Sequence, residues 1–165
     1  MTSRIITVFG ATGAQGGGLA RALLADPASG FNVRAATRKP DSEAGRALAK
    51  AGAEVVAADL DDAASVQRAM NGAYGAFCVT NFWEHFSPGK EIAQAGALAD
   101  AAAKAGVQHA IWSTLEDTRT FFAPDGTRMP VLMGKYKVPH FDAKGEANRL
   151  FTSKIPTTLL YTSFY

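Results

Sequence analysis

A glycine-rich turn near the start of the chain has the residue types and spacing of an anion site. Residues 5–9, Ile-Ile-Thr-Val-Phe, form an apolar, β-branched run typical of a buried parallel strand. The stretch that follows has glycines spaced G-x-x-G-x-x-G and comprises Gly10, Ala11, Thr12, Gly13, Ala14, Gln15 and Gly16. Glycines allow a tight turn and close backbone approach, and the N-terminus of the next helix attracts anions. The turn therefore predicts a site for a pyrophosphate, held by backbone N–H groups.

The glycine spacing alone is a weak signal. It differs from the standard dinucleotide fingerprint G-x-G-x-x-G, and glycine-rich turns are common. Its position after a strand and before a helix is the context that the fingerprint requires. A purely structural turn is the alternative to a dinucleotide site.

A basic pair follows the second expected strand, residues 32–37. Arg38 and Lys39 stand there, and the first carboxylate is Asp41. Sites for NAD usually place an acidic residue at this strand end, where it binds the ribose 2′-hydroxyl. A guanidinium instead clamps a 2′-phosphate and stacks on adenine. Arg38 therefore favours NADP(H) over NAD(H), the alternative being a solvated basic turn.

Polar side chains also follow the other expected strands. The strand ends supply Asp59 and Leu60, then Thr80, Asn81, Phe82 and Trp83, then Ser113 and Thr114. Because ligands of open parallel sheets sit beyond the carboxyl ends of the strands, these residues are candidates for one site. Asp59 suits either the adenine amino group or the cap of the next helix. Asn81 and Trp83 lie where a nicotinamide would pass, although Trp83 could equally cover apolar surface.

Alternating strand and helix patterns must position these residues. The strands are expected at 5–9, 32–37, 54–58, 75–80, 109–113 and 157–161, and the helices at 14–25, 43–51, from Asp61 or Asp62 to 70, 88–104 and 140–152. This alternation predicts right-handed crossovers and an α/β fold with a Rossmann-type, doubly wound parallel sheet. The rhythm breaks at residues 115–139, and a connection that long is usually functional or mobile.

The bulk composition predicts one globular domain over residues 1–165. The chain has 47% hydrophobic residues and a formal net charge of +2. Nothing in it points to nucleic acid or a membrane, and we expect a cytoplasmic-type protein. Cys78 lies in an apolar run and is expected to be a small buried hydrophobe. The histidines lack metal-ligand spacing, so no metal site is predicted.

Four stretches together resemble the NmrA-like family of atypical short-chain dehydrogenase/reductases, and especially its HSCARG-like NADPH-sensor branch. They are residues 8–17, 37–40, 79–84 and 140–146. The resemblance implies a Rossmann domain followed by a smaller C-terminal substrate domain. We expect that second domain to be absent from this chain, which ends at Tyr165 soon after its last expected strand.

The resemblance also implies which residues bind the cofactor. It implies NADP(H) binding through the turn from Gly10 to Gln15, with Arg38 on the 2′-phosphate. Asn81, Lys144 on the nicotinamide ribose, and the segment beginning at Tyr165 are implied as further contributors.

The catalytic pattern departs from that of working dehydrogenases of this type. Those enzymes use a serine at the end of strand five and a tyrosine four residues before a lysine. Here Ser113 and Lys144 are in place, but His140 stands at the tyrosine position, and Tyr136 lies one helical turn earlier. Histidine can still move protons near neutral pH.

The incomplete pattern leaves two functions open. Within the family it goes with sensing of the NADPH/NADP⁺ ratio through partner proteins, with weak or no turnover. The connection 115–139 would then respond to cofactor and change a surface for a regulatory partner, and an oligomer is possible. The alternative is an NADPH-dependent reductase of a small carbonyl compound or quinone.

Overall fold

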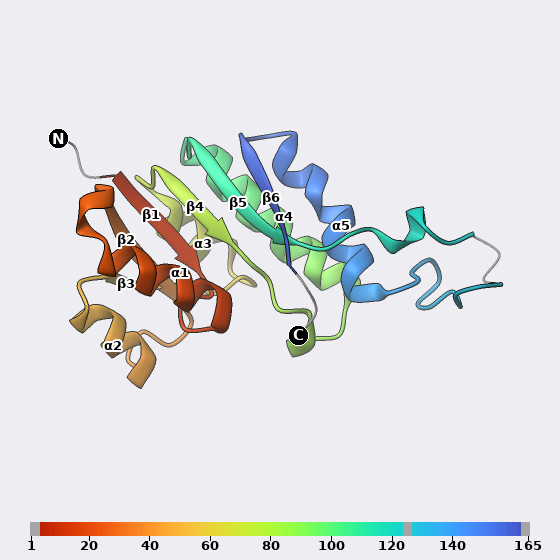
Figure 1. Ribbon diagram of the computed structural model, residues 1–165, viewed down its shortest axis with the longest axis horizontal. Helices are drawn as coiled ribbons and strands as arrows, with labels where there is room; N and C mark the ends of the chain where they lie inside the picture. Colours follow the sequence, from red (N-terminus) through yellow and green to blue (C-terminus); the bar gives the residue numbers. More distant parts are fainter. Residues whose placement is uncertain (1–3, 124–126, 163–165) are drawn as a thin grey trace.

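The computed structural model describes residues 4–123 and 127–162. Within these ranges the strands are β1 (Arg4–Phe9), β2 (Phe31–Thr37), β3 (Glu54–Ala57), β4 (Gly75–Cys78), β5 (His109–Thr114) and β6 (Thr157–Tyr161). They form one parallel sheet in the order β3-β2-β1-β4-β5-β6 (Figure 1). The order reverses between β1 and β4, which is the switch point of a doubly wound sheet. The predicted α/β, Rossmann-like fold is therefore confirmed.

Helices cover both faces of this sheet. They are α1 (Ala14–Ala25), α2 (Glu43–Lys50), α3 (Ala63–Met70), α4 (Pro88–Lys104) and α5 (Pro139–Thr152). On one face, Val8 and Phe77 pack with Leu48 of α2 and with apolar side chains of α1. On the other face, Phe9 and Trp112 belong to a core shared with α3, α4 and α5. Successive residues of β1 thus enter opposite cores, as strand alternation requires.

Polar caps begin three of the helices. The side chains of Ser42, Asp62 and Ser87 accept hydrogen bonds from backbone N–H groups in the first turns of α2, α3 and α4. Such caps satisfy donors that lack intrahelical partners. Asp62, rather than Asp61, is the cap of α3. Strand β4 ends at Cys78, two residues before the predicted end at Thr80, so Thr80 is part of the connection that enters the site.

The connection from β5 to α5 extends beyond α5 and away from the sheet (Figure 1). It contains a short 3-10 helix, η3 (Thr118–Thr120), and an isolated antiparallel bridge between Leu132 and Tyr136. The buried carboxylate of Asp142 in α5 holds both ends of the connection. It accepts hydrogen bonds from Thr118 N at 2.8 Å and Lys137 N at 2.6 Å. The aperiodic stretch predicted from sequence is therefore anchored at its base.

Two further expectations concern the core and the membrane. Cys78 is fully buried, and burial raises the pKa of its thiol, as expected for a small core hydrophobe. In the described part of the chain, no helix has the length and apolar character that crossing a bilayer needs.

Candidate dinucleotide-binding site

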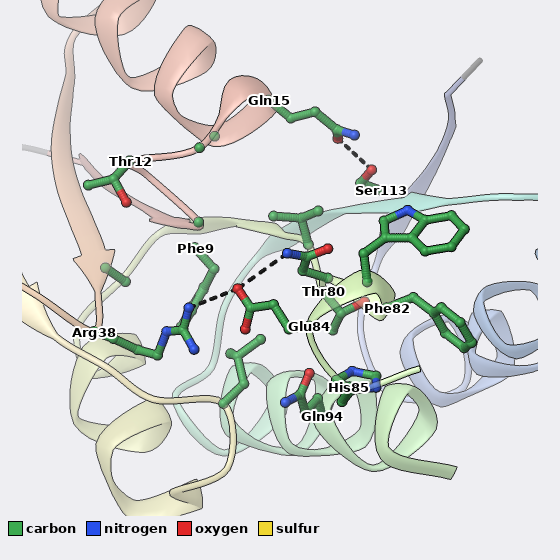
Figure 2. Close-up of a pocket in the computed structure, with 18 of the residues that line it drawn as sticks. Phe9, Thr12, Gln15, Arg38, Thr80, Phe82, Glu84, His85, Gln94 and Ser113 are labelled. Atoms are coloured by element: carbon green, nitrogen blue, oxygen red, sulfur yellow. Dashed lines mark hydrogen bonds and ion pairs between the residues drawn. The ribbon is translucent and has the colours of Figure 1, made fainter. Parts of the chain in front are cut away.

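A cavity of about 670 Å³ lies at the carboxyl edge of the sheet. Its walls come from the glycine turn, the segments after β2, β3 and β4, the end of β5, and the first half of α5. Figure 2 shows residues from the turn and from the connection after β4 facing each other across this space. The cavity lies at the switch point, where doubly wound sheets bind their ligands. The site residues predicted from separate strand ends are thus brought together.

The turn between β1 and α1 brings the backbone close to the cavity. Gly10 has φ +63°, in the left-handed region, and its carbonyl accepts from Gly13 N at 2.9 Å. A Cβ on Gly16 would lie 2.5 Å from the Gly10 carbonyl oxygen and 2.6 Å from that of Phe9. Only glycine fits there, because real Cβ atoms do not approach backbone oxygens so closely. Ala11 is fully buried and does not line the cavity, so it shapes the turn from behind.

Helix α1 begins without a polar cap. Gly13 is its N-cap residue, no side chain caps it, and its first turn carries no acidic residue. The positive end of the helix therefore faces the cavity without a protein carboxylate on its own first turn to offset it. This arrangement suits a phosphate group.

Gln15 and Ser113 join the glycine turn to strand β5. The Ser113 hydroxyl donates to Gln15 Oε1 at 2.6 Å, as Figure 2 shows. Ser113 is almost fully buried at the end of β5. The hydrogen bond holds both side chains at the wall of the cavity. Both residues were predicted from sequence to belong to the site.

Lys144 is held by the connection after β4 and by α4. Its Nζ lies 3.0 Å from Glu91 Oε1 and donates to Thr80 Oγ1 at 2.8 Å. Glu91 is fully buried, and the Thr80 hydroxyl donates to the same carboxylate at 2.5 Å. Burial lowers the pKa of Lys144, and the nearby Glu91 carboxylate opposes that effect. The pair keeps the lysine in one position beside the cavity.

His85 faces the second oxygen of Glu91. Its Nδ1 accepts a hydrogen bond from Ser87 N at 3.1 Å, which places the proton of the neutral ring on Nε2. That Nε2 lies 3.3 Å from Glu91 Oε2, without the geometry of a hydrogen bond. Glu91 is therefore flanked by a lysine on one side and a histidine on the other.

His140 lies among aromatic rings at the mouth of the cavity. Its ring centroid is 4.7 Å from that of Trp83, 5.8 Å from Phe82 and 4.9 Å from Phe141. Burial lowers the pKa of His140, although the Asp142 and Glu91 carboxylates partly oppose this shift. The imidazole is thus kept neutral near pH 7. Tyr136 is buried in the connection before α5 and does not line the cavity.

At the opposite end, Arg38 faces a carboxylate that the sequence did not indicate. Its Nη2 lies 2.8 Å from Glu84 Oε1 (Figure 2), and Asn81 Nδ2 donates to the same oxygen at 3.2 Å. Glu84 ends a 3-10 helix, η2 (Phe82–Glu84), in the connection after β4. The Arg38 and Glu84 side chains are more than two-fifths exposed.

The structure decides one alternative for the segment after β3. Asp59 does not cap α3, because Asp62 does. Asp59 Oδ1 accepts from Asp61 N at 3.0 Å, and Asp59 and Leu60 both line the cavity. Thr12, Gly13 and Ala14 also line it, whereas Tyr165 lies outside the described residues.

Sequence reasoning did not mark several charged or titratable residues of the site: Asp61, Glu84, His85 and Lys90, which line the cavity, and Glu91, which contacts Lys144. Glu84 and His85 directly follow the strand-end residues 80–83, and this proximity could have marked them. Glu91 gave no such signal, because a glutamate in the first turn of a helix is ordinary. Its contact with Lys144 joins residues 53 positions apart and depends on how α4 and α5 pack.

The parallel sheet, the glycine turn and the cavity at the switch point define a Rossmann-type nucleotide-binding class of protein. The chain belongs to the NmrA-like family, whose model matches residues 2–165.

One curated relative is the NmrA-like family domain-containing oxidoreductase FrzB of Cladobotryum sp. It is 46% identical over 114 residues, and the match covers 67% of this chain and 33% of that protein. Several other curated relatives are likewise named oxidoreductases. The chain therefore spans about a third of the length of the curated relatives it matches.

Solved structures of Nmra, a negative transcriptional regulator, have the same fold. Its complex with NAD is 28% identical with a TM-score of 0.75, and its complex with NADP is 27% identical with a TM-score of 0.69. Each match covers 98% of this chain and 45% of the solved chain.

Proposed function

We propose that the chain binds NADP(H) in the cavity at the carboxyl edge of its sheet. The observation that carries this proposal is the uncapped start of α1 at a turn where only glycine fits, with Arg38 across the same cavity. The turn would hold the pyrophosphate, and Arg38 would face the adenosine 2′-phosphate. The complexes of Nmra with NAD and NADP support a nicotinamide dinucleotide as the ligand.

We further propose that the protein is a redox-responsive regulator of the HSCARG-like branch, with weak or no turnover. His140 occupies the position of the usual tyrosine, and its ring packs against Phe82 and Trp83. Burial keeps its imidazole neutral. Nmra is itself a negative transcriptional regulator, and this supports a regulatory role for a protein of the same family.

The connection before α5 is the proposed surface for a regulatory partner. It is anchored by Asp142, and it exposes Phe121, Val131, Leu132 and Met133. Its first residue, Leu115, lines the cavity, and α5 carries both Asp142 and Lys144. A cofactor that contacts Leu115 and Lys144 would therefore change the position or mobility of the base of the connection.

Hydrogen exchange tests this coupling. We expect backbone amides in residues 115–138 to become more protected when the chain is saturated with NADPH, relative to the free chain. Amides of α2, none of whose residues lines the cavity, serve as the internal control. Unchanged protection of the connection despite saturated binding would contradict a regulatory role for it.

A second candidate function, reduction of a planar carbonyl compound or quinone, is favoured by the aromatic mouth of the cavity. Trp83 and Phe86 are more than half exposed, with ring centroids 5.7 Å apart, next to His140. Flat acceptors stack well on such rings. A bound NADPH would supply the hydride, while the neutral His140 and the Ser113 hydroxyl are the groups that would hold or move a proton.

Turnover assays separate the two functions. The regulator proposal predicts that NADPH oxidation across a panel of quinones and aldehydes stays far below about 1 s⁻¹, the low end of typical enzymes. Turnover at or above that rate, lost in His140→Phe but kept in His109→Phe, would establish the reductase instead. His109 is a suitable control because it lies at the amino end of β5, whereas the cavity lies at the carboxyl ends of the strands.

A further inference from the structure

The adenosine end of the cavity carries more negative than positive charge. Among the described side chains that line this end, the cations are Arg38 and Lys90, and the carboxylates are Asp59, Asp61 and Glu84. Lys90 already forms an ion pair with Asp61, with 2.7 Å between its Nζ and the Asp61 carboxylate. That contact and a hydrogen bond from Gln94 lower the pKa of Asp61, so it is charged at neutral pH. Arg38 is therefore the cation on which a 2′-phosphate would depend.

Glu84 forms an ion pair with the guanidinium of Arg38. Its Oε1 is 2.8 Å from Arg38 Nη2, and Asn81 Nδ2 donates to the same oxygen. The Arg38 and Glu84 side chains thus meet across the cavity, from the end of β2 to the connection after β4 (Figure 2). Asn81 thus steers the carboxylate toward Arg38. A phosphate that reached Arg38 would come close to the negative charge of Glu84.

We propose that Glu84 sets the cofactor selectivity of the site by opposing the 2′-phosphate at Arg38. This inference rests on the proposed binding of NADP(H). A carboxylate beside the guanidinium repels a 2′-phosphate, but it is an acceptor for the 2′-hydroxyl of NADH. The Arg38–Glu84 pair is solvent-exposed, and such pairs are weak, so a phosphate can displace it. The site therefore accepts both cofactors. Glu84 makes the preference for NADPH over NADH smaller than Arg38 alone would make it.

Glu84→Gln tests this role, with Glu54→Gln as its matched control. Glu54 also pairs with an arginine, at 2.8 Å between Arg34 Nε and Glu54 Oε2, and its own side chain is exposed. It lies at the start of β3, away from the carboxyl edge, and does not line the cavity. Both changes remove one negative charge and one arginine–carboxylate pair, but only the first touches the site. Dissociation constants for NADPH, NADH and adenosine 2′,5′-bisphosphate would be measured for the wild type and both variants.

We expect Glu84→Gln to bind NADPH and the bisphosphate ~3- to 10-fold more tightly, the effect of one removed charge in a solvated groove. NADH should bind equally or more weakly, and Glu54→Gln should match the wild type. If Glu84 merely oriented Arg38 for the phosphate, NADPH affinity would fall in Glu84→Gln, which overturns the inference. Equal changes for NADPH and NADH, or no change, overturn it as well. Absence of binding by every cofactor in all three proteins would instead refute the proposed function on which it rests.

Discussion

At the scale of single residues, two glycines in α1 have different roles: Gly16 is needed for the shape of the turn, whereas Gly18 is not. A Cβ on Gly16 would overlap the carbonyl oxygens of Gly10 and Phe9, whereas a Cβ on Gly18 would meet nothing within 4 Å. Gly16→Ala should lower the free energy of unfolding by about 1–3 kcal/mol because the turn must shift. It should also weaken NADPH binding, since the shift displaces the backbone donors. Urea unfolding and NADPH titration measure the two effects.

Gly18→Ala is the control for this change. Gly18 is exposed and helical, so alanine should raise stability by roughly 0.5–1 kcal/mol and leave NADPH binding unaltered. If the two variants bound NADPH equally well, the glycine turn would not be the phosphate cradle.

His140 gives a residue-scale prediction on pH. Burial holds its pKa below the unfolded value near 6.5, so at low pH the unfolded chain binds more protons than the folded chain. The contribution of His140 to stability is therefore lost as the pH falls through about 6.5. Compared with His140→Phe, the wild type should lose more stability between about pH 7.5 and about pH 5.5. Urea unfolding of both proteins at each pH measures this difference, and a difference that does not change with pH contradicts the expectation.

At the scale of elements, the base of the connection before α5 depends on one carboxylate. Asp142 accepts from Thr118 N, Thr118 Oγ1, Lys137 N and Val138 N, at 2.8, 2.6, 2.6 and 3.1 Å. Asp142→Ala removes these acceptors and leaves buried donors, which should cost on the order of 3 kcal/mol of stability. Limited proteolysis should cut within residues 115–138 faster than in the wild type. Asp26→Asn, at an exposed position, is the control and should behave as the wild type; equal cleavage of both variants would show that Asp142 does not anchor the connection.

The elements also show what could be predicted from sequence and what could not. Helix α1 and strand β6 lie at their predicted bounds, and Ser42, Asp62 and Ser87 explain local helix starts. These features depend on short-range patterns of apolar and capping residues. Contacts such as Arg38–Glu84 and Glu91–Lys144 join different elements, and local patterns carry no record of them. The location of the site at the strand ends could therefore be predicted from the sequence, whereas the ion pairs within it could not.

At the scale of the whole molecule, the fold brings the cavity-lining residues of the candidate site together at the carboxyl ends of the strands. Lys144 of α5 and the turn before α1 line the same cavity, which lies where the strand order reverses between β1 and β4, and Glu91 of α4 contacts Lys144. The chain covers 45% of the solved Nmra chains that it matches.

A calorimetric titration of the chain with NADPH and with NADH, repeated for Arg38→Glu, is the sharpest test of the proposed cofactor site. We predict saturable binding of both cofactors by the wild type, with NADPH the tighter ligand. In Arg38→Glu, NADPH should bind at least about tenfold more weakly, as expected when a charge-assisted phosphate contact is lost and a like charge replaces it. NADH binding should change little. Failure of the wild type to bind either cofactor, or equal NADPH affinity in both proteins, would contradict the proposed site.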